Sequence, residues 1–242
     1  MRIPRIFYPH TIVSGDEIIL DANSSKHILK VLRLNIGMTL IIFNGKGGEF
    51  VATILQVNNH RATVKIDRFI AKEVESPFKI HLTQGIGRGE KMDYVVQKAV
   101  ELGVHKITPL FTEYCNVKLT DERAQNRISR WQTIMINACE QSGRNIIPTI
   151  EAPQNLAVWL PKLQSPLKLL LDHRATKAIK TISGNYTAAT ILVGPEGGLS
   201  EDEILLAQKN GFISVHLGPR VLRTETAALV ALSVLQAQWG DF

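Results

Sequence analysis

The feature that most limits what this chain can fold into is a change of pattern at residues 72–77, a polar segment that ends in proline. Before it, short runs of alternating apolar and polar residues are separated by turns rich in glycine and asparagine, which is typical of β-strands. After it, apolar runs alternate with segments of helical periodicity. Strands that alternate with helices predict an α/β domain on a largely parallel sheet. We therefore expect two domains, residues 1–72 and residues 73–242.

The expected first domain is rich in β-structure. Strands are predicted at residues 39–43, 49–57 and 61–70, and a helix is predicted at residues 24–34. Short strands joined by Gly/Asn turns indicate a small barrel.

The expected second domain alternates strands with helices. Strands are predicted at residues 79–84, 106–111, 167–172, 190–194 and 213–217, and helices at residues 90–102, 121–141, 201–210 and 225–239. Gly103 and Gly211 stand where two of these helices should end. Ser200 and Glu203 have the spacing of a capping box, and Thr224 is placed to cap the last helix.

The positive charge of the chain is concentrated in its first third. The formal net charge is +6, and residues 1–72 hold 10 Lys and Arg against 5 Asp and Glu. Residues 73–242 hold 18 against 17. A small basic domain beside a near-neutral one indicates a polyanionic partner, although a solvated surface with uneven counts would give the same numbers.

Composition disfavours several classes of protein. The chain is 45% hydrophobic and 21% charged, as globular chains are, and no apolar run approaches the ~20 residues of a membrane span. The start of the chain lacks the apolar stretch of a signal peptide. Cys115 and Cys139 are expected to be free thiols, and the seven histidines form no pair with metal-ligand spacing. We expect a cytoplasmic protein that uses no metal and no membrane.

Three unusual loops follow predicted strands, where α/β sheets bind their ligands. The first, residues 85–91, begins like G-x-G-x-x-G but has Glu90 at the sixth position, so the dinucleotide fingerprint fails. Arg88 and Lys91 lie near a helix N-terminus, where positive charge is disfavoured. This placement indicates a site that receives an anion, whereas the glycines by themselves are explained by a tight turn.

The second loop, residues 193–200, holds three glycines and a proline between a buried strand and a capped helix. Glycines at this density allow backbone groups to line a ligand directly. Glu196 could accept hydrogen bonds from a ligand hydroxyl, or it could bind neighbouring backbone N–H groups. The sequence does not separate these two roles.

The third loop, residues 217–228, places two arginines, two threonines and a glutamate before a strongly apolar helix. For residues 226–228, composition alone favours close helix packing. A further polar segment, residues 139–145, ends the long helix. Together these loops and the basic domain indicate a nucleic-acid-acting enzyme with an organic cofactor, with the reaction left open.

In this order the loops resemble the SPOUT methyltransferase superfamily and, within it, the 16S rRNA uridine N3-methyltransferase family, over essentially the whole chain. The resemblance rests on residues 88–92 (RGEKM), 138–144 (ACEQSGR), 194–200 (GPEGGLS) and 217–227 (LGPRVLRTETA). Residues 27–37 are similar to the PUA-like RNA-binding module of the family. Met38 and Asn44 depart from the acidic residues expected there.

The resemblance implies a PUA-like β-barrel domain followed by a SPOUT domain with a deep C-terminal trefoil knot, in an obligate homodimer. It implies S-adenosylmethionine (SAM) as cofactor and N3-methyluridine as product, at the position of 16S rRNA conventionally numbered 1498. The substrate would be free 16S rRNA or the assembled small ribosomal subunit. By match, the cofactor-binding residues are Leu171, Val193, Gly194, Glu196, Gly197, Gly198, Leu217, Gly218, Val221, Leu222, Thr226 and Ala227.

Methyl transfer to N3 of a uridine needs alignment, together with help for the proton that leaves N3. Under the resemblance, Arg223 and Arg88 are candidates to support the uridine anion, since arginine is a permanently charged, planar donor. Phosphate contacts or interface ion pairs are their alternative roles. Glu225 or Glu140 could act as a base if burial raised its pKa, although we favour structural hydrogen bonding for both. The expected RNA contacts are Arg2, Arg5, Lys26, His27, Lys30, Arg33, Arg88 and Lys91.

Two other interpretations stay open at this point. One is a noncatalytic RNA-binding or ribosome-assembly protein on the same scaffold, which cofactor binding would distinguish. The other is a SPOUT methyltransferase that acts on tRNA or on a ribose hydroxyl. A nicotinamide-dependent enzyme is disfavoured by Glu90.

Overall fold

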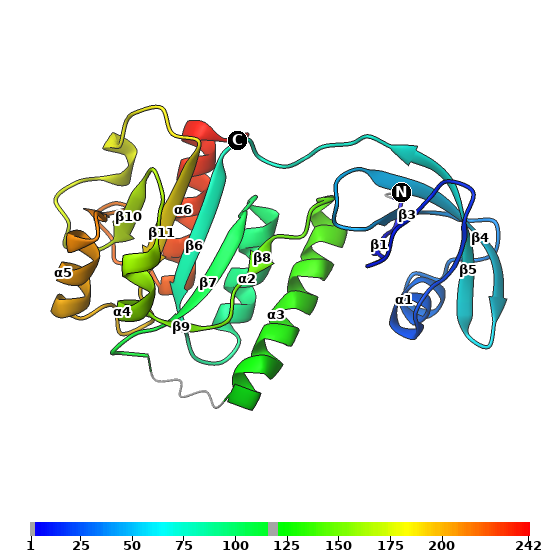
Figure 1. Cartoon of the computed structure of the whole chain (residues 1–242), viewed down its shortest axis with the longest axis horizontal. Coiled ribbons are helices and arrows are strands. Elements are labelled where there is room, and N and C mark those ends of the chain that lie inside the picture. The colour runs from blue at the N-terminus through cyan, green and yellow to red at the C-terminus, as the bar shows by residue number, and fades with distance from the viewer. Residues whose placement is uncertain (1–2, 116–120) are drawn as a thin grey trace. The chain divides into compact units, whose positions relative to one another are not determined.

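A computed structural model describes residues 3–115 and 121–242 of the chain (Figure 1). The chain divides into two compact units. The first comprises Met1–Glu75 and Cys139–Ile147, and the second comprises Ser76–Ala138 and Pro148–Phe242. The domain limits expected from the sequence stay a prediction, and the sequence did not indicate that residues 139–147 group with the first unit.

The first unit is built on a five-stranded mixed sheet with the order β1-β3-β4-β5-β2. β1 pairs with β3 in parallel, and the other pairs are antiparallel. Its elements are β1 (Arg5–Phe7), β2 (Glu17–Ile19), α1 (Ala22–Lys26), the π-helix η1 (His27–Val31), β3 (Thr39–Phe43), β4 (Glu49–Asn58) and β5 (Arg61–Ile70). The three strands predicted from the sequence are confirmed, and β4 runs one residue further than expected. In the described pairs, β1 and β2 stand at the two ends of the order.

The core of the first unit follows from strand periodicity. Alternate residues of each strand point to the same face of a sheet, and one face carries a cluster of buried apolar side chains. The buried side chains of this cluster include Ile6, Ile18, Leu20, Leu40, Ile42, Ala52, Ile54, Ala62, Val64 and Ile66. Ile28 of η1 packs into the same cluster, so the helical segment covers this face.

The helix predicted at residues 24–34 begins and ends earlier. The side chain of Asp21 accepts hydrogen bonds from the backbone N–H groups of Asn23 and Ser24, so α1 begins at Ala22. After Val31 the helical path ends, and Arg33 takes a positive φ of 55°. The sequence interpretation missed the N-cap because it relied on the apolar period, which starts after the polar first turn.

Arg5 is buried, with 8% of its surface exposed. Its guanidinium forms an ion pair with Glu49 and donates to Asn145 Oδ1 at 2.6 Å and to the carbonyl of Arg144 at 3.1 Å. Arg144 in turn pairs with Glu75. The structure therefore contradicts the expectation that Arg5 contacts RNA phosphates, because this side chain binds residues 139–147 inside the unit instead.

The second unit is built on a seven-stranded sheet with the order β12-β10-β11-β6-β7-β8, and β9 also pairs with β7. All the pairs described in this sheet are parallel. The strands are β6 (Lys79–Gly85), β7 (Lys106–Phe111), β8 (Thr149–Ile150), β9 (Gln154–Asn155), β10 (Lys168–Leu171), β11 (Ala188–Val193) and β12 (Ile213–Val215). The helices are α2 (Lys91–Glu101), α3 (Asp121–Ser142), α4 (Leu156–Trp159), α5 (Glu201–Lys209) and α6 (Thr224–Trp239), with 3₁₀ turns η2 (Leu160–Lys162) and η3 (Ile179–Thr181).

Helices cover this sheet. In Figure 1, α6 lies behind β6 and β11, and α6 also packs against α2. Helices α4 and α5 pack with β7, β10 and β11 in one apolar cluster that includes Leu110, Trp159, Leu170, Leu192 and Ile204. The predicted strands and helices of this unit are all present within about two residues of their expected bounds, which confirms the α/β interpretation. The short elements β8, β9, α4, η2 and η3 were missed because they are too brief to show a period.

The helix ends predicted from capping residues are confirmed in three cases and wrong in one. The Ser200–Glu203 capping box is confirmed, with both of its hydrogen bonds present. Gly103 and Gly211 end their helices with φ of 79° and 84°, as expected of glycine after a helix C-terminus. The prediction for Thr224 is wrong: the N-cap of α6 is Arg223, and Thr224 is the first helical residue. Among the described residues, no helix is both long and apolar enough to cross a membrane.

The sheet order fixes where a ligand can bind. From β6 the chain passes to β7 on one side and later returns to β11 on the other side, with Val193 opposite Gln84. The carboxyl ends of β6 and β11 therefore lie where the direction of winding reverses, which is the usual binding position in open α/β sheets.

Candidate cofactor site

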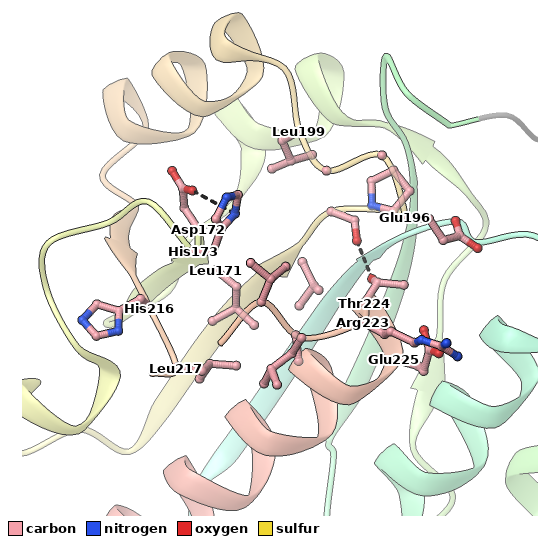
Figure 2. A pocket seen from close by; sticks show the side chains of 18 of the residues that line it. Leu171, Asp172, His173, Glu196, Leu199, His216, Leu217, Arg223, Thr224 and Glu225 are labelled. Atoms are coloured by element: carbon pink, nitrogen blue, oxygen red, sulfur yellow. Dashed lines mark hydrogen bonds and ion pairs between the residues drawn. The ribbon is translucent and has the colours of Figure 1, made fainter. Parts of the chain in front are cut away.

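A cavity of about 610 Å³ opens at the carboxyl edge of the seven-stranded sheet (Figure 2). The loops after β10, β11 and β12 and the first turn of α6 form its wall. Of the residues expected to bind the cofactor, those that line it are Leu171, Val193, Gly194, Glu196, Gly197, Gly198, Leu217, Gly218, Val221, Leu222 and Ala227. Thr226 is exposed and does not line the cavity. The second and third loops of the sequence analysis thus form one site with the segment after β10, and the first loop contributes only Lys91 to it.

The glycines of this site are required by close backbone approach. A Cβ at Gly85, the last residue of β6, would lie 2.5 Å from Pro195 Cδ and 2.6 Å from Pro195 N. A Cβ at Gly194 would lie 2.9 Å from the backbone carbon of Gly198. The N–H of Gly198 donates to the carbonyl of Pro195 at 2.9 Å and closes a turn. The strand end and the glycine-rich loop therefore pack main chain against main chain, which a larger residue would prevent.

Glu196 joins two of the loops. Its Oε1 accepts the backbone N–H of Arg88 at 3.0 Å and lies 3.1 Å from Lys91 Nζ. Partial burial would raise the pKa of Glu196, but the hydrogen bonds from backbone N–H groups and the ammonium of Lys91 outweigh it and lower the pKa below its usual value. Figure 2 shows this carboxylate at the rim of the cavity, directed away from the leucines. Of the two roles that the sequence left open, the structure supports backbone binding.

The candidate catalytic residues are separated by the structure. Arg223 and Glu225 line the cavity at the start of α6. One carboxylate oxygen of Glu225, Oε2, is buried and has no hydrogen-bond partner among the described residues. Arg88 is exposed and does not line the cavity, whereas Lys91, expected only as an RNA contact, does.

Glu140, the other candidate base, lies in the first unit. Its Oε1 accepts the N–H of Phe7 at 2.9 Å. Burial raises the pKa of Glu140, and the hydrogen bond from Phe7 opposes this in part. Glu140 does not line the cavity, so its observed role is the structural hydrogen bond that the sequence analysis favoured.

Sequence reasoning missed several residues of the cavity wall, including Asp172, His173 and His216. Asp172 pairs with Arg174 at 3.2 Å. His216 Nδ1 accepts the N–H of Gly218 at 3.1 Å, so a neutral ring carries its proton on Nε2. All three residues directly follow β10 or β12, and position after a parallel strand was the signal that could have found them.

The expected RNA contacts lie mostly in the first unit. Four of them are exposed on one short stretch of chain. Lys26 ends α1, His27 and Lys30 lie on η1, and Arg33 follows it. Arg2 lies outside the described residues. Their contact with RNA stays a prediction.

Fold and cavity together define a class of protein. The site has leucine walls, main-chain groups from a glycine-rich loop and a few charged side chains at the start of a helix. Within residues 3–115 and 121–242, no three or more His, Cys, Asp or Glu side chains are grouped as metal ligands. These features are those of an α/β enzyme domain that binds a small organic cofactor.

Comparison with known proteins gives the family. The RNA methyltransferase domain matches residues 74–236, and the RNA methyltransferase PUA domain matches residues 20–67. The chain belongs to this RNA methyltransferase family. A relative from Buchnera aphidicola subsp. Schizaphis graminum, named Ribosomal RNA small subunit methyltransferase E, is 39% identical over 241 residues, which are 99% of this chain and 98% of the relative. A protein of the same name from Bacillus subtilis is 30% identical over 95% of this chain and 91% of its own length.

Solved structures agree. A Legionella pneumophila protein in complex with the bound cofactor SAM superimposes with a TM-score of 0.97 at 42% identity, covering 100% of both chains. Ribosomal RNA small subunit methyltransferase E from Neisseria gonorrhoeae, bound to S-adenosyl methionine, gives a TM-score of 0.93 at 39% identity, again covering 100% of both chains. The expected fold class, a PUA-like module followed by a SPOUT-type methyltransferase domain, is confirmed, and the trefoil knot stays a prediction.

Proposed function

We propose that this chain is a SAM-dependent methyltransferase that methylates N3 of a uridine in 16S rRNA, at the position conventionally numbered 1498. The observation that carries the proposal is the cavity at the carboxyl edge of the sheet, which gathers nearly all the residues matched to the cofactor. The relatives of this chain named above carry the same substrate class in their name, and two similar structures hold SAM. We also propose that the protein acts as a homodimer in the cytoplasm.

The residues present suit SAM. A volume of about 610 Å³ falls in the range of small-molecule sites. Leu171, Leu217 and Leu222 offer an apolar wall to a flat purine, and the loop from Gly194 to Gly198 offers main-chain donors and acceptors. The buried Oε2 of Glu225, which has no partner within the described part of the chain, can accept a hydrogen bond from a bound polar group. Bound SAM supplies a methyl group on a sulfonium.

The side chains around this cavity would act on the nucleophile. Uridine N3 carries a proton in its neutral form, and this proton must pass to solvent or to a carboxylate as N3 bonds to the methyl group and the sulfonium becomes a thioether. Loss of the proton, not the methyl transfer itself, places negative charge on the base. Arg223 lines the cavity and is exposed, so its guanidinium can reach a substrate that enters from solvent. A permanent positive charge placed where an anion develops lowers the barrier. We assign to Arg223 the support of this anion.

The first unit would supply RNA affinity. Lys26, Lys30 and Arg33 present positive charge on one short exposed stretch, and phosphate contacts of this kind are weakened by salt. Replacing the three with alanine should weaken RNA binding and flatten its dependence on salt concentration. An unchanged salt slope would remove this surface from the proposal.

In the decisive experiment, the purified protein is incubated with SAM and with small ribosomal subunits from a strain that lacks N3-methyluridine. The nucleosides of the rRNA are then analysed by mass spectrometry. We expect N3-methyluridine at one position. Arg223→Ala should lower the single-turnover rate about 100-fold with unchanged SAM affinity, and Arg220→Ala, in the same loop, serves as the matched loss of charge. Methylation of tRNA or of a ribose would overturn the proposed substrate, and a normal rate for Arg223→Ala would overturn its role.

A further inference from the structure

Three oxygens surround the side-chain amide nitrogen of Gln84. They belong to the end of β6, to the loop after β11 and to the start of α6. The Nε2 of Gln84 lies 2.9 Å from Thr224 Oγ1, 3.1 Å from the carbonyl oxygen of Gly85 and 3.3 Å from the carbonyl oxygen of Gly194. Gln84 has only 1% of its surface exposed. Because all three neighbours are oxygens, the amide nitrogen and not the amide oxygen must face them. The orientation of this side chain is therefore fixed by its surroundings.

The hydrogen bonds run in one direction. Gln84 donates to the hydroxyl of Thr224, and that hydroxyl donates to the carbonyl of Gly194 at 2.5 Å. Figure 2 shows the bond from Thr224 crossing from the start of α6 to the glycine-rich loop. Thr224 does not cap its helix, since the N-cap is Arg223 and has no side-chain cap bond. The hydroxyl thus serves the loop and not the helix.

These bonds join the three parts of the cofactor site. Gly194 begins the glycine-rich loop, and Thr224 lies between Arg223 and Glu225, which line the same cavity. Pro195, next in the loop, packs against Gly85, where there is no room for a Cβ. The loop is therefore held to α6 and the Gln84 side chain by hydrogen bonds and packs closely against the backbone of β6.

The two ends of the Gln84 amide differ in their hydrogen bonding. Its Oε1 is buried without a hydrogen-bond partner among the described residues, and an unsatisfied buried acceptor destabilises a fold. An apolar side chain of similar length would avoid that cost. The position is therefore better explained by what the nitrogen holds in place.

We propose that Gln84 and Thr224 are positioning residues for methyl transfer, which act through the Gly194 carbonyl to hold the cofactor loop in register with the start of α6. This inference rests on the proposed function and goes beyond it, because it assigns each residue a positioning role: Gln84 lies outside the matched loops, and Thr224, which lies within residues 217–227 and lines the cavity, acts through its hydrogen bond to Gly194. Small displacements of a bound reactant lower rates steeply, so loss of this link should affect both cofactor affinity and the chemical step.

The test compares isosteric variants. Thr224→Val removes the hydroxyl and keeps the shape, Thr224→Ser keeps the hydroxyl, and Gln84→Met removes the amide. We expect Thr224→Val and Gln84→Met to weaken SAM affinity roughly tenfold and to slow single-turnover methylation at saturating SAM. Thr224→Ser should stay within about threefold of wild type. Isothermal titration with SAM and rapid-quench methylation of small ribosomal subunits measure these quantities.

The matched control lies one residue away. Thr83, also buried on β6, donates its hydroxyl to the carbonyl of Ile191 on β11 at 2.8 Å, away from the loop. Thr83→Val removes a comparable hydroxyl-to-carbonyl bond, which joins β6 to β11 and does not reach the loop, so it should lower the melting temperature while SAM affinity and rate stay normal. Equal losses of affinity in Thr83→Val and Thr224→Val, or no rescue by Thr224→Ser, would overturn the proposal. If wild type itself binds no SAM, the proposed function fails instead, and the two failures are thereby distinguished.

Discussion

The two edges of the seven-stranded sheet are both hollowed, with cavities of about 610 Å³ at the carboxyl edge and about 500 Å³ at the amino edge. At the amino edge, polar side chains pair with one another: His81 Nε2 lies 2.7 Å from Thr108 Oγ1, which donates to Glu151 Oε2 at 2.6 Å. Glu151 also pairs with Lys106 at 2.5 Å. At the carboxyl edge, glycines expose the main chain, and the buried oxygens that lack partners among the described residues include Gln84 Oε1 and Glu225 Oε2.

This difference indicates that one edge of the sheet contributes mainly to stability and the other mainly to ligand binding. Side chains that satisfy each other stabilise the fold and leave little for a ligand to bind. Backbone groups and unpartnered acceptors lower stability, and a ligand can satisfy them. The comparison therefore predicts that changes at the carboxyl edge alter binding and catalysis, whereas changes at the amino edge alter stability.

The largest effect is expected at Gly85. In Gly85→Ala the new Cβ meets Pro195 backbone and ring atoms at about 2.5 Å, so the loop must move. We expect SAM affinity to fall by about 100-fold or more, measured by titration calorimetry. Gly87→Ala is the matched control, because the nearest atoms to its Cβ would be those of the movable carboxylate of Glu196, at 3.3 Å. Similar affinities for the two variants would show that the loop is not fixed by this close approach.

The second-largest effect is expected at His81, at the amino edge of the sheet, where the stability of the fold should depend on pH. Burial, with a smaller contribution from Lys106, lowers the pKa of His81 from 6.5 to about 4. As pH falls from 6.5 towards 4, the unfolded chain takes up a proton that the folded chain excludes, so His81 destabilises the fold by up to about 3 kcal/mol over this window. Above pH 6.5, His81 is neutral in both the folded and the unfolded chain, so this destabilisation is absent.

Denaturant unfolding at several pH values tests this expectation. His81→Gln should flatten the loss of stability between pH 6.5 and pH 4 while leaving SAM affinity at neutral pH unchanged. His10→Gln, at an exposed position of the first unit, is the control for removing a histidine. A loss of SAM affinity in His81→Gln would break the distinction between the two edges.

The smallest effect is expected at Glu196. Glu196→Gln removes the charge that attracts Lys91 but keeps an oxygen for the N–H of Arg88. Since partly exposed ion pairs contribute about 1 kcal/mol or less, we expect SAM affinity to change by no more than about fivefold. Because the pKa of Glu196 is lowered in the folded state, its contribution persists at neutral pH and is lost only as pH falls through that lowered pKa. A change above 100-fold would show direct ligand contact.

Much of the fold was readable from local pattern. The alternation after residue 77 predicted every long strand and helix of the second unit, and the capping box at Ser200 predicted the start of α5. These signals act over a few residues, because helix and strand periods and caps are local hydrogen-bonding effects. Thr224 misled the interpretation for the same reason, since nothing within a few residues shows that its hydroxyl binds Gly194.

The site was predicted in part. The cofactor residues came from a family resemblance that rests on residues 88–92, 138–144, 194–200 and 217–227, and all but Thr226 line one cavity. Asp172, His173 and His216 were missed because nothing in the sequence of these residues marks a ligand site, apart from their position after β10 and β12. Arg5 was misjudged because its charge suggested solvent, whereas Glu49 and Asn145 compensate its burial.

By itself, the sequence determined the order and extent of the main elements, the glycine-rich loops and the basic character of the first third of the chain. Only the tertiary structure decided which groups meet. Gln84 and Thr224 are 140 residues apart, and Arg5 and Asn145 are equally far apart. Local patterns reflect interactions over a few residues, whereas the partner of a buried polar group depends on how elements that are distant in the sequence pack together in the folded chain.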